Sequence, residues 1–290
     1  MSVLHYLPDT IKQPYRLARA WALSVSLKPR QRFQLSPREK VASSKVSVVV
    51  PVHNAPVATS RCLAALAAFA GDAEVVLVDD ASNPEVARML ADAQAQNGWM
   101  LVRHEMALGH SRACEAGVAV STRPYVCLLN SDAIVSHRSW VGIVDAFESS
   151  DAIAIVGPST SYTVGPQTVR RAMHCRHYWT NEQTWSFAER YVNRHDEQPL
   201  VDRPFVGGFA FFVRRSAWDA VDGFDKNLPD YGNEVEFCRR IRAAGFRVFW
   251  SRRSYVHHLG KESYGVTFGK RLISGLRVQA QEYIDQKYGQ

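Results

Sequence analysis

Two acidic stretches of this sequence have the residue types and positions to carry chemistry. The first follows an apolar run, 125–129, whose composition is typical of a strand buried on both faces; Asn130, Ser131 and Asp132 come directly after it. Ligands of open α/β sheets bind beyond the carboxyl ends of the strands, so we expect Asp132 at the floor of a cleft. A hard cation that holds a diphosphate needs oxygen ligands there. The alternative interpretation is a polar turn that caps the following helix.

The second stretch opens a predicted helix. If Asn233 is the N-cap, Glu236 falls at position N3 and completes a capping box, which is a structural role. Glu234 lies on the same stripe as Cys238 and Ile241, four and seven residues on, so it faces inward. An inward carboxylate is costly unless a partner or a ligand uses it. We therefore predict that Glu234 is the functional base; pairing of Glu234 with a nearby arginine is the alternative.

The elements that position these residues alternate between strand and helix with short connections, which predicts βαβ units and a parallel sheet. Right-handed crossovers would then place the strand ends on one edge. We expect strands at 46–52, 74–78, 99–103, 125–129, 153–156, 205–213 and 247–250, and helices at 56–71, 84–97, 109–120, 139–147 and 234–244. The fold class is thus α/β, with a Rossmann-like, mostly parallel sheet flanked by helices and with helical appendages at both ends.

Two regions depart from this alternation. Residues 158–204 lose periodicity, which favours a mobile or substrate-facing loop. His174, Cys175 and His177 within it have the ligand types of a zinc site, but their spacing matches no strong pattern. The tail 268–288 is amphipathic and would dock on the domain or on a second subunit.

Composition bounds the remaining possibilities. A chain of 290 residues can bury a full core, and one α/β domain with appendages is favoured over two domains. The five cysteines are odd in number and form no CxxC, which indicates reduced thiols and a cytoplasmic protein. The sequence shows no signal peptide and no apolar stretch long enough to cross a bilayer.

The net charge of +7 is concentrated in the first 45 residues. This leader is expected to contain a short helix after Pro14, with Leu17, Ala20 and Trp21 on one side. A basic leader could lie on an anionic membrane surface, or it could pack on its own domain. Nucleic acid is disfavoured as a partner, because the sequence lacks the basic and aromatic strand pattern that stacks bases.

With these motifs in order, the chain resembles the family-2 glycosyltransferases with the GT-A fold. The resemblance runs from Ser47 to Gly265 and rests on segments 48–54, 78–82, 129–133 and 231–238. It implies a leader at 1–45, a GT-A domain at 46–265 with a nucleotide-binding half (46–132) and an acceptor half (133–265), and a C-terminal helix at 266–290. Asn233-Glu234 stands where the family usually has Glu-Asp, and Ala107 and Glu115 replace common asparagines.

The resemblance also implies roles for particular residues. Glu234 would be the catalytic base, and Mg²⁺ or Mn²⁺ would be held by Asp132 with His257 or His258. Basic side chains at Arg252, Arg253 and Lys261 could screen phosphate charge. Gly207, Gly208 and Asn233 would contact the donor and acceptor sugars. The nucleotide would be bound by Pro51, Val52, His53, Asn54, Asp79, Asp80, Gly109, Arg112, Asn130 and Ser131. Asp79 and Asp80 could instead form an Asx-turn, and both roles can coexist.

The expected activity is inverting, metal-dependent transfer of a sugar from a UDP- or dTDP-sugar. The acceptor would be a glycan or a lipid-linked saccharide in surface polysaccharide biosynthesis. A sugar-phosphate nucleotidyltransferase is one alternative, but it should carry a glycine-rich, basic loop after the first strand, and the residues there are His53, Asn54, Ala55 and Pro56. A non-catalytic glycan- or nucleotide-binding module is the other alternative.

Overall fold

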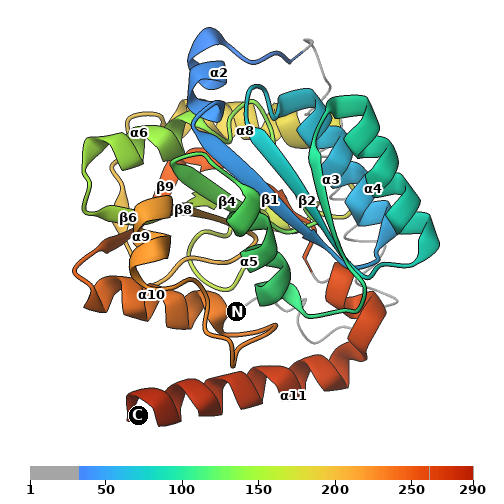
Figure 1. The fold of residues 1–290 in the computed structure, drawn as a ribbon. Helices are drawn as coiled ribbons and strands as arrows, with labels where there is room; N and C mark the ends of the chain where they lie inside the picture. The colour runs from blue at the N-terminus through green and yellow to red at the C-terminus, as the bar shows by residue number, and fades with distance from the viewer. Residues whose placement is uncertain (1–32, 261, 290) are drawn as a thin grey trace, which may run out of the picture.

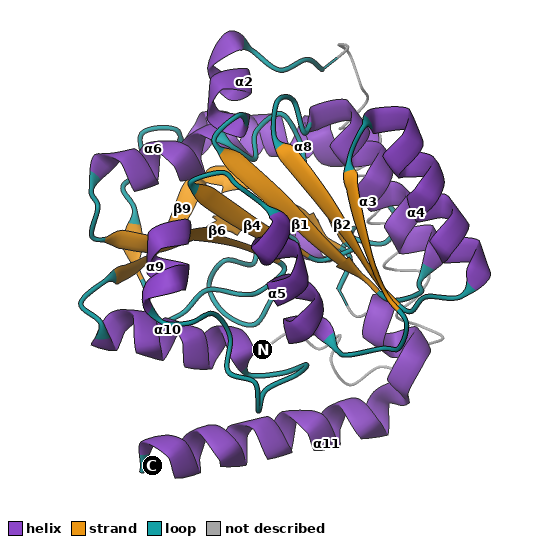
Figure 2. Ribbon diagram, viewed as in Figure 1, coloured by secondary structure: helices purple, strands orange, loops and turns teal. Residues whose placement is uncertain are grey.

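The computed structural model describes the backbone of residues 33–260 and 262–289 and the side chains of 33–260 and 274–289. The short helix expected after Pro14 lies outside these ranges. The chain folds as an α/β protein in which helices cover both faces of a central sheet (Figures 1 and 2).

The central sheet is mostly parallel, as the alternation of elements predicts. Its order is β3-β2-β1-β4-β8-β6-β9-β7; β8 runs antiparallel to β4 and β6, and β7 runs antiparallel to β9. The carboxyl ends of β1, β2, β3 and β4 therefore lie on one edge (Figure 1). The strands are β1 (Val46–Val52), β2 (Glu74–Asp80), β3 (Met100–His104), β4 (Tyr125–Leu129), β6 (Ile153–Ser159), β7 (Val201–Asp202), β8 (Ala210–Arg214) and β9 (Arg247–Tyr255).

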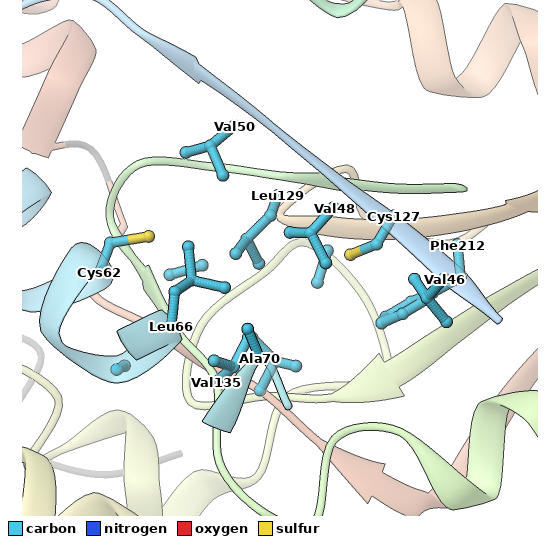
Figure 3. Close-up of a cluster of buried hydrophobic side chains, with 14 of the residues drawn as sticks. Val46, Val48, Val50, Cys62, Leu66, Ala70, Cys127, Leu129, Val135 and Phe212 are labelled. Atoms are coloured by element: carbon cyan, nitrogen blue, oxygen red, sulfur yellow. The ribbon is translucent and has the colours of Figure 1, made fainter. Parts of the chain in front are cut away.

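Alternating side chains of the strands enter two separate cores. One lies between the sheet and α3 (Pro56–Phe69), α4 (Pro84–Asn97) and α6 (Val141–Ser149). The other lies under α5 (His110–Val120), α9 (Arg215–Ala220) and α10 (Asn233–Ala243). Figure 3 shows Val48 and Leu129 of the sheet facing Leu66 of α3. Both faces of β1 and β4 are buried, and this burial holds their carboxyl ends rigidly for a site.

A second, two-stranded sheet joins two motifs that are far apart in the sequence. β5 (Ala133–Ile134) pairs antiparallel with β10 (His257–His258), and His258 lies opposite Ala133. The backbone N–H of Leu259 donates to the carbonyl of Asp132 at 3.0 Å. This two-stranded ladder places His258 beside Asp132, in the turn after β4.

The prediction of a loop over 158–204 is wrong for much of that stretch. It contains α7 (Arg170–Met173), α8 (Asn181–His195) and β7. α8 begins with a capping box between Thr180 and Gln183, and Phe187 and Val192 bury its inner face. Trp185, Ala188 and Val192 recur at helical spacing, so the sequence did contain a signal for α8.

The described part of the leader packs on its own domain. Residues 37–43 form α2, and Ala42 is buried in the first core. Arg38 contacts Asp145 of α6 at 2.7 Å, and Lys45 pairs with Glu148 of the same helix. For this segment the interpretation of a basic arm on its own domain is the one observed.

The C-terminal helix α11 (Glu262–Tyr288) docks on the segment that leads into α10. Ala280 and Ile284 pack on Leu228. Lys287 donates to Asp225 and to Glu236, each at 2.6 Å, and the hydroxyl of Tyr288 donates to Glu236 at 2.9 Å. Figure 1 shows α11 running below α10. The helix begins four residues before the predicted boundary of 266.

Docking of α11 should weaken in acid. Burial alone would raise the pKa of Asp225, but hydrogen bonds from Lys287, Asn227 and Tyr283 lower it from 3.8 to about 2. A carboxyl whose pKa is lower in the folded state stabilises that state above its unfolded pKa and loses the effect as pH falls through its folded pKa. Hydrogen exchange should therefore show amides of 276–288 losing protection between about pH 4 and pH 2.

The matched variants separate this effect from general acid sensitivity. Asp225→Asn should lower the protection of 276–288 already at pH 7. Asp92→Asn changes an exposed carboxylate on α4 and should leave it intact. Full protection of 276–288 in Asp225→Asn would show that the contacts of Ile284 and Glu236 suffice to hold α11.

Candidate active site

A cavity of about 500 Å³ opens at the carboxyl edge of the parallel strands. The loops after β1, β2, β3 and β4 form one side of it, and the turn before α10 and the helix α11 form the other. The lining residues are Pro51, Val52, His53, Asp80, Ala107, Leu108, Gly109, His110, Ala113, Asn130, Ser131, Asp132, Tyr162, Asp230, Tyr231, Glu234, His258 and Arg277. Asp132 and Glu234, which are about a hundred residues apart in the chain, thus face the same space.

Asp132 and His258 form the buried end of this cavity. The Nε2 atom of His258 lies 3.1 Å from Oδ1 of Asp132, and the exposed fractions of the two residues are 9% and 3%. Nδ1 of His258 lies 2.7 Å from the carbonyl oxygen of Tyr162, so Nδ1 carries the proton and donates it. This bond directs Nε2 toward Asp132. Burial lowers the pKa of His258, but the carboxylate of Asp132 outweighs it and the net shift is upward.

The pair fits a divalent cation. Two ligands at neighbouring corners of an octahedral site with bonds of about 2.1 Å stand about 3 Å apart, and the observed separation is 3.1 Å. The bond from Nδ1 to Tyr162 supplies the outer contact that usually fixes a ligating histidine. Among the described side chains, 33–260 and 274–289, no group of three His, Cys, Asp or Glu residues could hold a metal ion, so substrate or water oxygens would complete the shell.

His257 does not reach the cavity. It is fully buried, with Nδ1 3.0 Å from the hydroxyl of Tyr255 and Nε2 3.0 Å from the carbonyl of Arg176. Burial, chiefly, lowers the pKa of His257 to about 3. Neighbouring residues of an extended chain face opposite sides, and the structure turns His258, not His257, toward Asp132.

The described residues contain no group of three or more His, Cys, Asp or Glu side chains that could hold a metal ion, so His174, Cys175 and His177 do not form the zinc site considered from their residue types. Cys175 is instead buried in an apolar cluster with Trp179 and Phe187. All five cysteines of the chain are buried.

The two aspartates at the carboxyl end of β2 have different positions. Asp80 lines the cavity and accepts hydrogen bonds from the backbone N–H groups of Leu108 and Gly109, each at 2.9 Å. Asp79 is not among the lining residues; it accepts from the N–H of Ser82 at 2.8 Å and pairs with Arg103. Asp79 thus forms the Asx-turn, and Asp80 holds the loop after β3 beside the cavity.

Two other predicted nucleotide contacts, Asn54 and Arg112, are not among the residues that line the cavity. Asn54 accepts a hydrogen bond from the N–H of Asn83 at 2.9 Å, which ties the loops after β1 and β2. Arg112 pairs with Glu115 at 3.1 Å on the surface of α5. Pro51, Val52, His53, Gly109, Asn130 and Ser131 do line the cavity.

Glu234 faces the cavity as predicted, but helix α10 begins differently from the prediction. The N-cap of α10 is Gly232, in the left-handed region with φ of +78°, so the predicted capping box of Asn233 with Glu236 is wrong. Glu236 is fully buried and pairs with Arg240 at 2.8 Å and with Lys287. Asn233 is buried as well and donates to the hydroxyl of Ser111 at 2.9 Å, which anchors the turn to α5.

The glycine pair makes room for side chains of the protein itself. A Cβ atom at Gly208 would lie 1.6 Å from Oε1 of Glu234, and one at Gly207 would lie 2.2 Å from Oγ1 of Thr163. The predicted strand over 205–213 begins only at Ala210. Neither glycine is among the lining residues, so Gly208 acts by allowing Glu234 its position.

The comparison with protein families decides what this site belongs to. Residues 47–221 match the model of Glycosyl transferase family 2. The chain belongs to this family. The matched segment contains the family-2 strands that carry Asp80 and Asp132, and it ends before Glu234 and His258.

Curated relatives match a smaller part of the chain. Uncharacterized proteins of Mycobacterium bovis and Mycobacterium tuberculosis are 29% identical over 85 residues, which is 28% of this chain and 31% of theirs. The chain thus spans about a third of the length of these relatives.

Solved structures show the same fold at low identity. GalNAc-T7 with UDP, GalNAc and Mn²⁺ has a TM-score of 0.57 at 18% identity, over 74% of this chain and 43% of that one. The mannosyltransferase PcManGT of Pyrobaculum calidifontis, with GDP-Man and Mn²⁺, has a TM-score of 0.52 at 16% identity, over 84% and 64%. S. aureus TarS has a TM-score of 0.53 at 15% identity, over 74% and 36%. The fold of this family-2 chain is therefore GT-A.

The site also contains residues that the sequence patterns did not single out. Tyr162 comes from the loop after β6, Asp230 from the turn before α10, and Arg277 from α11. The basic residues that the sequence suggested for screening phosphate charge do not line the cavity. Arg253 pairs with Asp145, and Arg252 contacts Gln198. Lys261 lies outside the described residues. The spacing of Arg277 from Ala280 and Ile284 would have placed it on the docked face of α11, and this was the available signal.

Proposed function

We propose that this family-2 glycosyltransferase catalyses inverting, metal-dependent transfer of a sugar from a nucleotide sugar to a saccharide acceptor. One observation carries the proposal: the Asp132–His258 pair and Glu234 line the same cavity at the carboxyl edge of the sheet. The Asp132–His258 pair is suited to hold a cation, and Glu234 is suited to accept a proton. An inverting displacement uses a proton acceptor on one side of the reacting carbon and stabilisation of the leaving group on the other side.

Asp132 and His258 would hold Mg²⁺ or Mn²⁺, which when bound neutralises the charge that develops on the departing diphosphate. One oxygen and one nitrogen ligand suit Mn²⁺ better than Mg²⁺, because Mg²⁺ prefers an all-oxygen shell. The hydrogen bond from His258 to Tyr162 keeps Nε2 facing the site. Tyr162 thereby acts as a positioning residue for the metal ligand.

Glu234 would act as the general base. Its carboxylate takes the proton of the acceptor hydroxyl as that oxygen forms a bond to the anomeric carbon. The bond from this carbon to the diphosphate breaks at the same time, and the nucleoside diphosphate leaves with the electron pair. The configuration inverts because attack and departure occur on opposite faces, and no covalent intermediate forms.

For the donor we propose a UDP- or dTDP-sugar. Asp80 lines the cavity at the end of β2; His104 and Leu108 occupy its Oδ1 atom, and its Oδ2 atom, which accepts from Gly109, has a second lone pair for an N–H group of a pyrimidine ring. The acceptor would be a glycan or lipid-linked saccharide of surface polysaccharide biosynthesis. A peripheral membrane contact through the basic N-terminus and a homodimer remain hypotheses. No helix within residues 33–260 and 262–289 is long and apolar enough to cross a membrane.

A thermal-shift screen of UDP, dTDP, GDP and ADP, with and without Mn²⁺, tests the proposal. A ligand present at about a hundred times its Kd stabilises the folded state by about 2.7 kcal/mol, which raises the melting temperature by several degrees. We expect UDP or dTDP to give the largest shift, and only with Mn²⁺. A chain that no nucleoside diphosphate stabilises would refute the proposed function.

Gly208→Ala should disable the base without removing the nucleotide site. The added methyl would occupy the position of the Glu234 carboxylate, which must then move. Displacement of a reacting group by about 1 Å can cost on the order of a hundredfold in rate. Steady-state transfer assays should show this loss in kcat, with an unchanged thermal shift from UDP and Mn²⁺.

Gly275→Ala is the matched control. A Cβ atom at Gly275 in α11 would meet nothing within 4 Å. Its kcat should equal that of the wild type. A Gly208→Ala enzyme with full kcat would mean that Glu234 is not held where the reaction needs a base.

A further inference from the structure

Arg277 is held at the cavity by the docking of α11. It lies three residues before Ala280 and seven before Ile284, so all three share one helix face. Ala280 and Ile284 are buried against Leu228, and the bonds of Lys287 to Asp225 and Glu236 fix the end of the helix. This fixed face directs Arg277 toward the cavity that it lines.

The cavity is rich in carboxylates. Asp80, Asp132, Asp230 and Glu234 line it, and Arg277 is the one lysine or arginine among its lining residues within the described side chains. An anionic substrate group is repelled by such a wall unless a cation meets it. The diphosphate of the donor meets its cation at Asp132 and His258.

Arg277 belongs to the other end of the cavity, beside Glu234. Its guanidinium carbon lies 5.1 Å from the ring centre of Tyr231, which precedes Glu234 by three residues. Arg277 is exposed, whereas Asp132 and His258 are buried, so Arg277 lies at the mouth. The acceptor must enter there, because Glu234 has to meet its hydroxyl.

We infer that Arg277 binds an acid group of the acceptor, so that the acceptor is an anionic saccharide with a phosphate or carboxylate close to its reacting hydroxyl. The inference rests on the proposed function. A guanidinium suits this task, because its planar fork of N–H donors pairs with two oxygens of a phosphate or carboxylate. The contact of Arg277 with the ring of Tyr231 engages one face of the guanidinium, and its remaining N–H donors can pair with an acid group of the acceptor.

Exposed apolar side chains at the mouth of the cavity help to distinguish a lipid phosphate from a sugar carboxylate as the acid group. Leu108 lines the cavity and is 44% exposed, and Met106 two residues earlier is 69% exposed. A phosphate that carries an alkyl chain could place the chain on these side chains. A carboxylate on the sugar ring would not use them.

Calorimetric titration of the protein loaded with Mn²⁺ and UDP or dTDP tests the inference. The probes are methyl glucoside, glucose 1-phosphate, glucuronate and glucosyl octyl phosphate. We expect at least one charged probe to bind more tightly than methyl glucoside. Arg277→Gln should weaken that probe by about 10- to 100-fold, the effect of a lost hydrogen bond to a charged group, and Arg277→Lys should weaken it less. Glucosyl octyl phosphate binding best assigns the lipid-linked source; glucuronate binding best assigns the carboxylate.

Arg239→Gln is the matched control, because Arg239 lies over the ring of Tyr288 and does not line the cavity. It should leave every affinity unchanged. Three results would overturn the inference: no preference of the wild type for charged probes, equal losses for charged and neutral probes in Arg277→Gln, or a loss confined to UDP.

The titrations are repeated without nucleotide. A chain that binds the charged probes through Arg277 but no nucleoside diphosphate would refute the proposed function and keep the anion site. A chain that binds UDP with Mn²⁺ but binds charged and neutral probes equally would overturn the inference about Arg277 and leave the proposed function standing.

Discussion

Replacing Glu234 by glutamine should lower the rate of sugar transfer about 10²- to 10⁴-fold, the usual contribution of a general base. Glutamine keeps the size of the side chain and its place beside Gly208 but does not accept a proton. The loss should appear in kcat, since Glu234 faces the cavity from the first turn of α10 and not from the loops after β1 to β4, where we propose that the nucleotide binds. The thermal shift from UDP and Mn²⁺ should persist.

The control for this variant is Glu115→Gln, which removes a carboxylate that pairs with Arg112 on α5. It should leave kcat within a factor of about two, as expected for a surface ion pair. Donor turnover should be followed by release of the nucleoside diphosphate. Equal rates for wild type and Glu234→Gln would favour a non-catalytic binding module on the same fold.

Asp132→Asn should abolish the dependence of nucleotide binding on Mn²⁺ and reduce transfer by about a thousandfold or more. A metal that stabilises the leaving group contributes several kcal/mol to the transition state, and each 1.4 kcal/mol is a factor of ten. Asparagine keeps the shape of Asp132 but offers a neutral amide to the cation. Mn²⁺ titration followed by electron paramagnetic resonance measures the loss directly.

The adjacent histidines provide a matched pair for this test. His258→Gln should weaken Mn²⁺ binding, because Nε2 of His258 lies 3.1 Å from Asp132. His257→Gln should instead lower thermal stability, because His257 is buried between Tyr255 and the carbonyl of Arg176. Greater loss of Mn²⁺ affinity in His257→Gln than in His258→Gln would contradict the assigned metal end of the cavity.

Removing the carboxylate should also change the titration of His258. The negative charge of Asp132 outweighs burial and raises the pKa of this imidazole. In Asp132→Asn this charge is lost while burial still lowers the pKa, so the pKa of His258 should fall below that of the wild type. Nuclear magnetic resonance titration of the metal-free protein measures the direction, and an unchanged pKa would mean that the two side chains do not interact.

The order of the strands and helices in the sequence predicts a parallel sheet and the edge of that sheet at which the site lies. Runs such as 46–52 and 125–129 are apolar on both faces and can only be central strands, and the helices between them force parallel crossovers. Asp80 ends β2 and Asp132 lies in the turn after β4, so their positions at the cavity follow from local order along the chain. The alternation predicted most of these elements to within a few residues.

The three-dimensional fold was needed to show which side chains from distant parts of the sequence lie together. His258 faces Asp132 because β5 pairs with β10, and two-residue strands have no sequence pattern. Asn233 is bound by Ser111 and Glu236 by Lys287, and both partners are far away in the sequence. Arg277 enters the site through the docking of α11. Contacts of this kind depend on long-range packing, whereas periodicity and capping report only on neighbours within a few residues.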